Sequence, residues 1–199
     1  EDRNGIIWLA CTGAGLSQFD DQEQRFRDIM PTSQETGEVM SKLVRFLFED
    51  RQGNIWVATS GDGIYMLPRW CKHVHIIQHD ENESITLGRG DVMDLAEDRS
   101  GALWVASSGG SATRIFPNGE IEYLPLTQPE LCSYLWLQSV EEDSKGNIWF
   151  NYPRHFVRFN WEQQKFESIR HRLKVPEDGF TTGGHTITED SLGNIWLGK

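Results

Sequence analysis

The chain has 199 residues, of which 38% are hydrophobic and 25% are charged, a balance typical of a folded globular domain rather than a disordered chain. Its 30 acidic residues outnumber its 19 lysines and arginines, and the resulting net charge of -11 disfavours nucleic acid and anionic lipid surfaces as partners. No apolar run approaches the roughly 18 residues that a membrane-spanning helix needs, so we expect no direct membrane insertion.

A phrase of the form Glu-Asp-x-x-Gly-x-x-Trp recurs along the whole chain. Its five copies occupy residues 1–8, 49–56, 97–104, 142–149 and 189–196. Successive copies place their tryptophans 45 to 48 residues apart, a period typical of propeller blades and of some helical arrays. Between the copies, short runs rich in β-branched and aromatic residues alternate with Gly, Asn, Asp and Pro. This pattern predicts strands and excludes helical repeats.

The best-preserved period predicts four strands, at residues 43–48, 54–59, 63–68 and 73–78. Four antiparallel strands in each period make one blade of a β-propeller, so we predict an all-β propeller fold for residues 1–199. The chain holds material for about four blades plus one extra strand, and we expect these blades to form an arc of a larger seven- or eight-bladed ring.

The repeated phrase is expected to be structural, because five equivalent copies cannot all line one site. Its Asp and Gly predict the tight turn between the first and second strands of a blade, since Asp can accept a turn N–H and Gly adopts positive φ easily. Its Trp is expected to pack between neighbouring blades. The residues given this structural role are Asp50, Gly53, Trp56, Asp98, Gly101, Trp104, Asp143, Gly146, Trp149, Asp190, Gly193 and Trp196.

The phrase resembles the repeat of the two-component regulator propeller family, notably at residues 57–64 and in the polar loop at residues 82–87. The resemblance spans the chain. It implies a periplasmic, ligand-sensing segment of a hybrid histidine kinase whose parent protein is anchored in the inner membrane, often for carbohydrate sensing. The implied partners are the remaining blades and the downstream signalling domains of the parent. No kinase domain is present in this segment, which is therefore expected not to be an enzyme; a homodimer is left open.

The loops between blades and those between the second and third strands share one face of a propeller, where we expect a ligand to bind. The polar and aromatic residues predicted on that face are Arg89, Asp91, Tyr134, Trp136, Arg154, His155 and His185. Aromatic rings and arginine forks suit a sugar ring that bears a carboxylate or sulfate. We therefore predict a small-molecule or oligosaccharide ligand and no catalytic residue.

Metal and cofactor sites are not predicted. His73 and His75 would share one face of a strand, but no third ligand has a suitable spacing, and this outer strand is expected to face solvent. The three cysteines, Cys11, Cys71 and Cys132, form no C-x-x-C pair, so they encode neither a disulfide framework nor a structural zinc site, and their role stays open.

Two functions of other classes remain open. The first is a propeller enzyme of the lyase or quinoprotein type, in which His155 or His185 would act as an acid or base. The second is a purely structural propeller that docks other proteins. The sequence names neither the ligand nor the downstream output.

Overall fold

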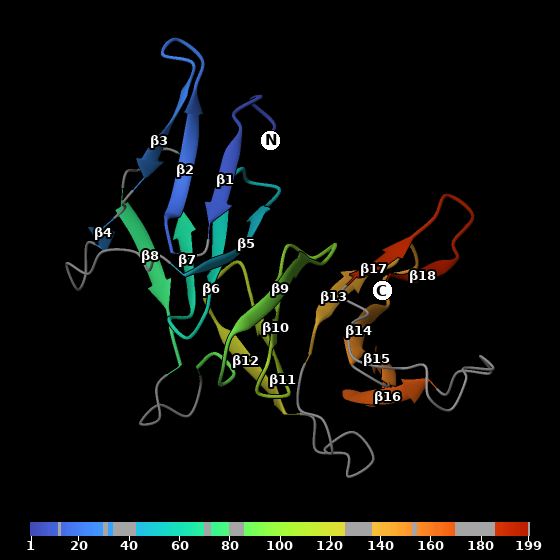
Figure 1. Cartoon of the computed structure of the whole chain (residues 1–199). Helices are drawn as coiled ribbons and strands as arrows, with labels where there is room; N and C mark the ends of the chain where they lie inside the picture. The colour runs from blue at the N-terminus through green and yellow to red at the C-terminus, as the bar shows by residue number, and fades with distance from the viewer. Residues whose placement is uncertain are drawn as a thin grey trace, which may run out of the picture. The chain divides into compact units, whose positions relative to one another are not determined.

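The computed structural model describes residues 1–11, 13–29, 32–33, 43–69, 73–79, 86–125, 137–152, 155–169 and 186–198. Every regular element within these ranges is a β-strand (Figure 1), which confirms the predicted all-β fold. Because these ranges hold no helix, they hold none that is long and apolar enough to cross a membrane.

The chain divides into two compact units, unit 1 (Glu1–Glu81) and unit 2 (Asn82–Lys199). Unit 1 contains a three-stranded sheet in the order β1-β2-β3 and a five-stranded sheet in the order β4-β8-β7-β6-β5. Its strands are β1 (Trp8–Cys11), β2 (Gly15–Asp20), β3 (Arg25–Ile29), β4 (Thr32–Ser33), β5 (Val44–Glu49), β6 (Ile55–Thr59), β7 (Ile64–Leu67) and β8 (His73–Ile77).

Unit 2 contains two four-stranded sheets, in the orders β12-β11-β10-β9 and β13-β14-β15-β16, and the two-stranded sheet β17-β18. Consecutive strands within each of these sheets pair antiparallel. The strands are β9 (Val92–Glu97), β10 (Leu103–Ser107), β11 (Ser111–Ile115), β12 (Ile121–Pro125), β13 (Ser139–Glu142), β14 (Ile148–Tyr152), β15 (His155–Asn160), β16 (Lys165–Ile169), β17 (Thr186–Glu189) and β18 (Ile195–Gly198).

The sheets are the predicted antiparallel blades. The four strands predicted in the best-preserved period correspond to β5, β6, β7 and β8, and complete four-stranded blades follow in β9–β12 and β13–β16. One strand was not predicted. The short strand β4 pairs in parallel with the outer strand β8, with Thr32 opposite His73 and Ser33 opposite Val74, so it extends the outer edge of this blade.

The repeated Asp and Gly close the same turn in all five copies. The N–H of each Gly donates to the carbonyl of the Asp three residues earlier at 2.8–3.0 Å, and these glycines have φ between 81° and 84°. The N–H of each Asp donates in turn to the carbonyl four residues later, also at 2.8–3.0 Å. Because side chains other than glycine are strained at such φ values, the repeated Gly follows from the turn.

The carboxylate of each motif Asp also holds the motif Trp of its own blade. The indole N–H donates to this carboxylate at 2.7–3.0 Å in all five copies. Burial alone would raise the pKa of Asp98, but hydrogen bonds from Ser100, Trp104, Ala102 and Arg114 outweigh burial and leave the pKa lowered. The carboxylate thus stays charged while it orients the ring.

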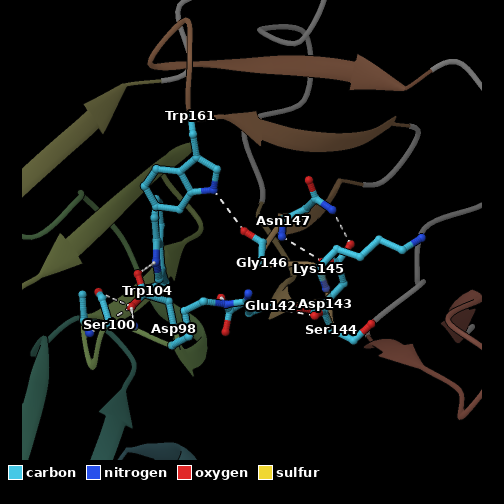
Figure 2. Close-up of polar contacts among 12 residues, drawn as sticks. Asp98, Ser100, Trp104, Glu142, Asp143, Ser144, Lys145, Gly146, Asn147 and Trp161 are labelled. Carbon is cyan, nitrogen blue, oxygen red and sulfur yellow. Dashed lines mark hydrogen bonds and ion pairs between the residues drawn. The ribbon is translucent and has the colours of Figure 1, made fainter.

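In unit 2, Trp104 fills the junction between the blades β9–β12 and β13–β16 (Figure 2). Its side chain is 0% exposed. Its ring centroid lies 5.8, 5.4 and 5.9 Å from those of Phe150, Phe159 and Trp161 in the next blade, mostly in edge-to-face contact. The guanidinium of Arg114 lies 5.3 Å from the centroid of Trp104 and 4.8 Å from that of Trp161, so cation–π contacts join the same two blades.

The other motif tryptophans show how burial depends on a neighbouring blade. In unit 1, Trp8 packs on the core that contains Ile55 and Val57 of the next blade. Trp149 is half-buried and stacks on Phe156 of its own blade, with centroids 4.7 Å apart. Trp196, by contrast, is 59% exposed. The same residue in the same turn is therefore sealed only where another blade covers it.

In three copies, the Glu that opens the phrase has a role that the sequence did not reveal, because it ties its blade to the blade before it. In each case the donor is the residue that follows the motif Asp of the preceding blade. The pairs are Arg3 with Glu49 (2.9 Å), Arg99 with Glu142 (2.8 Å), and Ser144 with Glu189 (2.6 and 2.7 Å). The Glu and Asp of one phrase thus act between blades and within a blade, respectively.

These differences in burial predict unequal costs of removing a motif Trp. Trp104→Ala should lower the free energy of unfolding by about 3–5 kcal/mol, because it empties a sealed aromatic junction. Trp196→Ala should cost clearly less, since solvent already reaches that ring. Urea unfolding of both variants measures the difference, and equal losses would contradict the role assigned to the junction.

Candidate functional site

The end of each blade opposite the Asp–Trp turn carries the loops predicted to bind a ligand, and we call this end the loop face. Here the second strand of a blade turns into its third, and the chain enters the first strand. The described parts of the loop face are residues 13–14, 43 and 60–63 in unit 1 and residues 86–91, 107–111 and 137–138 in unit 2.

In unit 2, the segment that carries Arg89 and Asp91 is bonded to the turn at residues 107–111. The N–H of Asp91 donates to Oγ of Ser108, and the N–H of Ser108 donates to the carbonyl of Asp91, both at 2.9 Å. The N–H of Gly109 donates to the carbonyl of Arg89 at 2.9 Å. The Arg89 side chain is exposed and that of Asp91 is half-buried. The loop backbone is therefore fixed, while the Arg89 side chain reaches the surface.

Two glycines allow these segments to approach so closely. A Cβ at Gly109 would lie 2.3 Å from the carbonyl oxygen of Arg89, and a Cβ at Gly88 would lie 2.0 Å from Oγ of Ser111. The hydroxyls of Ser107 and Ser111 are buried here and have no hydrogen-bond partner among the residues that the structure describes. The glycines are thus required by packing of the loop rather than by the repeat.

A bulge in the first strand adds a candidate that the sequence did not single out. In β5 the register shifts between Val44 and Phe46, so Arg45 is an extra residue in the strand. The exposed Arg45 donates from Nε to Oγ of Ser60 on the loop face of unit 1. The register of β9 shifts in the same way at Met93. Because bulges commonly redirect side chains and are frequent next to binding sites, Arg45 is a further candidate on the loop face.

Of the residues predicted to bind ligand, the structure brings together Arg89 and Asp91. His155 begins β15, but its side chain lies outside the described residues. The remaining four predicted residues lie wholly outside the described ranges. They are Tyr134, Trp136, Arg154 and His185. The ligand-binding role of all seven therefore stays a prediction.

The structure describes only part of the histidine pair and of the three cysteines. Across the described ranges, no group of three or more His, Cys, Asp or Glu residues could hold a metal ion. His75 is exposed on the outer strand β8, and Cys11 is an exposed free cysteine. The side chain of His73 and the whole of Cys71 and Cys132 lie outside the described residues.

Unit 1 has a hollow of about 150 Å³ at the other end of its blades. It is lined by motif residues and by the first strand of the next blade, which are Glu1, Asp2, Trp8, Leu47, Phe48, Glu49 and Ile55. This hollow belongs to the Asp–Trp turn and its junction rather than to the loop face.

Comparison with protein families supports the reading of the repeat. The family model described as two component regulator propeller matches residues 39–61, which include the second copy of the phrase. This match confirms the resemblance seen in the sequence for the segment that it covers. No curated protein matches the sequence at a significant level.

Many solved structures resemble the chain in fold, among them two extracellular domains and a lyase. The extracellular domain assigned to a hybrid two-component system of B. thetaiotaomicron aligns with a TM-score of 0.70 and 22% identity over 98% of this chain and 25% of its own. An extracellular domain assigned to a one-component system of the same organism aligns with a TM-score of 0.69 and 19% identity, over 97% of this chain and 24% of its own. Virginiamycin B lyase of Staphylococcus aureus, in an inactive form with quinupristin, aligns with a TM-score of 0.67 and 17% identity, over 99% of this chain and 60% of its own.

These likenesses confirm the propeller fold and concern the fold alone. The chain spans about a quarter of the length of the two extracellular domains, 25% and 24%. Extracellular domains of one- and two-component systems and a lyase share the architecture, so the function must be argued from the residues of the loop face.

The close packing of the loop predicts a specific sensitivity to substitution. Gly109→Ala should lower the free energy of unfolding by about 1–3 kcal/mol, because its Cβ would press on the backbone of Arg89. Gly119→Ala is the matched control, since its Cβ meets open space and only the positive φ of 88° opposes it, at about 1 kcal/mol. Chemical denaturation compares the two, and a smaller loss for Gly109→Ala would show that the loop does not pack as described.

Proposed function

We propose that the chain is a ligand-sensing stretch of blades from the extracellular or periplasmic region of a two-component regulator. The observation that carries this proposal is the regulator propeller repeat at residues 39–61, whose phrase returns in four further copies at similar spacing. The likeness in fold to extracellular domains of one- and two-component systems supports it. In this proposal a parent protein anchored in the inner membrane relays the signal to a histidine kinase.

The exposed faces of the two units support an arc of a seven- or eight-bladed ring. In unit 2, Trp196 is 59% exposed, whereas the equivalent Trp104 is sealed by the next blade. In unit 1, Leu9 is 42% exposed, whereas Val57 at the same place in the next blade is 0% exposed. Further blades of the parent protein would bury both apolar surfaces in the way that the existing junctions do.

The proposed ligand is an oligosaccharide fragment bound on the loop face. Because the net charge of -11 opposes an anionic ligand at long range, recognition must depend on short-range donors. Arg89 offers such a donor on a fixed backbone, and Arg154 is the second proposed donor. Tyr134 and Trp136 are proposed to stack on a sugar ring.

Substitution of the arginines tests this proposal. Arg89→Ala and Arg154→Ala should each weaken binding by about 1.5–3 kcal/mol, the range for a hydrogen bond to a charged group. His75→Ala, on the exposed outer strand, should leave affinity unchanged. The measurement is calorimetric titration with a panel of neutral and acidic glycan fragments. Loss of binding in the His75 variant, with both arginine variants intact, would place the site elsewhere.

A lyase is the second candidate, favoured by the fold likeness that covers 60% of the virginiamycin B lyase chain. In that case His155 or His185 would serve as the acid or base. The same fragment panel separates the candidates when its products are followed by mass spectrometry. Turnover that His155→Ala or His185→Ala abolishes would favour the lyase, whereas neither binding nor turnover would favour a structural propeller that docks proteins.

A further inference from the structure

Asp94 joins the first strands of two neighbouring blades in unit 2. Its Oδ2 accepts the N–H of Val140 on β13 at 3.0 Å, and its Oδ1 accepts the N–H of Leu95 on β9 at 2.9 Å. Ala106, which is paired with Asp94 across the sheet, belongs with Val140 to the buried core around Trp104. The carboxyl group therefore lies where the inner strands of the two blades meet.

The other ionisable side chains on β9 and on the strands packed beside it are acidic. β9 carries Glu97, the adjacent β10 carries no ionisable side chain, and β13 carries Glu141 and Glu142. Beyond β13, the strand β17 carries Glu189. The nearby cation, Arg99, donates its Nε–H to Glu142 at 2.8 Å. In the described structure, no cation on these strands faces the carboxyl group of Asp94.

Protonation of Asp94 is favoured by this environment. Burial raises the pKa of Asp94 to about 7, although the N–H groups of Val140 and Leu95 act in the opposite direction, and the charge of Glu141 raises it further. Burial also raises the pKa of Glu141, to which the charges of Glu142 and Glu189 add. Both effects favour the neutral acid in the folded chain.

We propose that Asp94 makes the junction between β9 and β13 proton-dependent, so that the neutral carboxyl holds the two blades together and its ionisation weakens them. Asp94 is half-buried, and a carboxylate that is partly removed from water is costly when its neighbours are acidic and no cation on the adjoining strands faces it. The unfolded chain relieves that cost. The contribution of Asp94 is therefore fully present below the unfolded pKa of 3.8 and is lost as the pH rises through about 7.

The effect of Asp94 does not depend on the proposed ligand, but it extends along β9 to the loop face. Strand β9 begins directly after the segment that carries Arg89 and Asp91. A junction that loosens at higher pH would therefore loosen the base of that segment. Protonation of Asp94 would thus affect the same segment of the loop face as the proposed ligand.

The test is urea unfolding of the whole chain from pH 5 to pH 8, with Asp94→Asn and the exposed control Asp21→Asn. For the wild type and the control, the folding equilibrium constant should fall by roughly tenfold or more as the pH rises. Asp94→Asn removes the titrating group but keeps an acceptor oxygen, so most of this fall should disappear. An unchanged pH dependence in Asp94→Asn would overturn the proposal.

An NMR titration of the side-chain carboxyl carbons in the folded wild type provides a second test, which does not require any variant to fold. The Asp94 carboxyl is expected to titrate near pH 7. A midpoint near that of an ordinary aspartate, about 4, would equally overturn the proposal.

Discussion

The hydrogen bond between the motif Asp and the motif Trp is the interaction on which the architecture depends. One carboxylate accepts from the indole and, in the same turn, from the backbone N–H four residues later, so the hairpin and the ring orientation are fixed together. The ring can then pack against the next blade, as Trp104 does on Phe150 and Phe159. In three copies the Glu beside the Asp adds a hydrogen bond across a junction, as Glu142 does with Arg99. Each blade thus contains its own turn and contributes one side of the junction with each neighbouring blade, which is why the phrase repeats.

The two ends of a blade have different roles, and this difference bears on what the loop face can do. The Asp–Trp end repeats the same turn and indole bond in all five copies, whereas the described loop-face segments differ between copies. In unit 2 it builds a packed loop from Gly88, Gly109 and Ser108, and that loop presents Arg89. Asp94 lies between the two ends and makes the inner-strand contact sensitive to protons. Binding and proton sensing would therefore act on the first strand of one blade.

Much of the fold could be predicted because five copies repeat what is common to every blade. Features common to every blade account for the correct predictions, which are the turn glycine, the buried Trp104 and the strands at 43–48, 54–59, 63–68 and 73–78. Features of single copies leave no such signal. The two-residue strand β4 depends on pairing with β8, and the bulge at Arg45 depends on tertiary register. The link from Arg99 to Glu142 and the bond from Val140 to Asp94 likewise depend on which blades are neighbours. For the candidate site, loop position was enough to place Arg89 and Asp91 on the loop face, but it could not show the turn to which their backbone is bonded.

Hydrogen exchange at the five motif indole N–H groups, followed by NMR, tests most directly whether these rings are held by carboxylates and sealed between blades. The Trp104 indole should exchange slowest, because it is bonded to Asp98 inside a closed junction. The Trp196 indole, bonded to Asp190 but 59% exposed, should exchange fastest of the five. Equally fast exchange at Trp104 and Trp196 would contradict a junction in which the next blade seals the carboxylate-held ring.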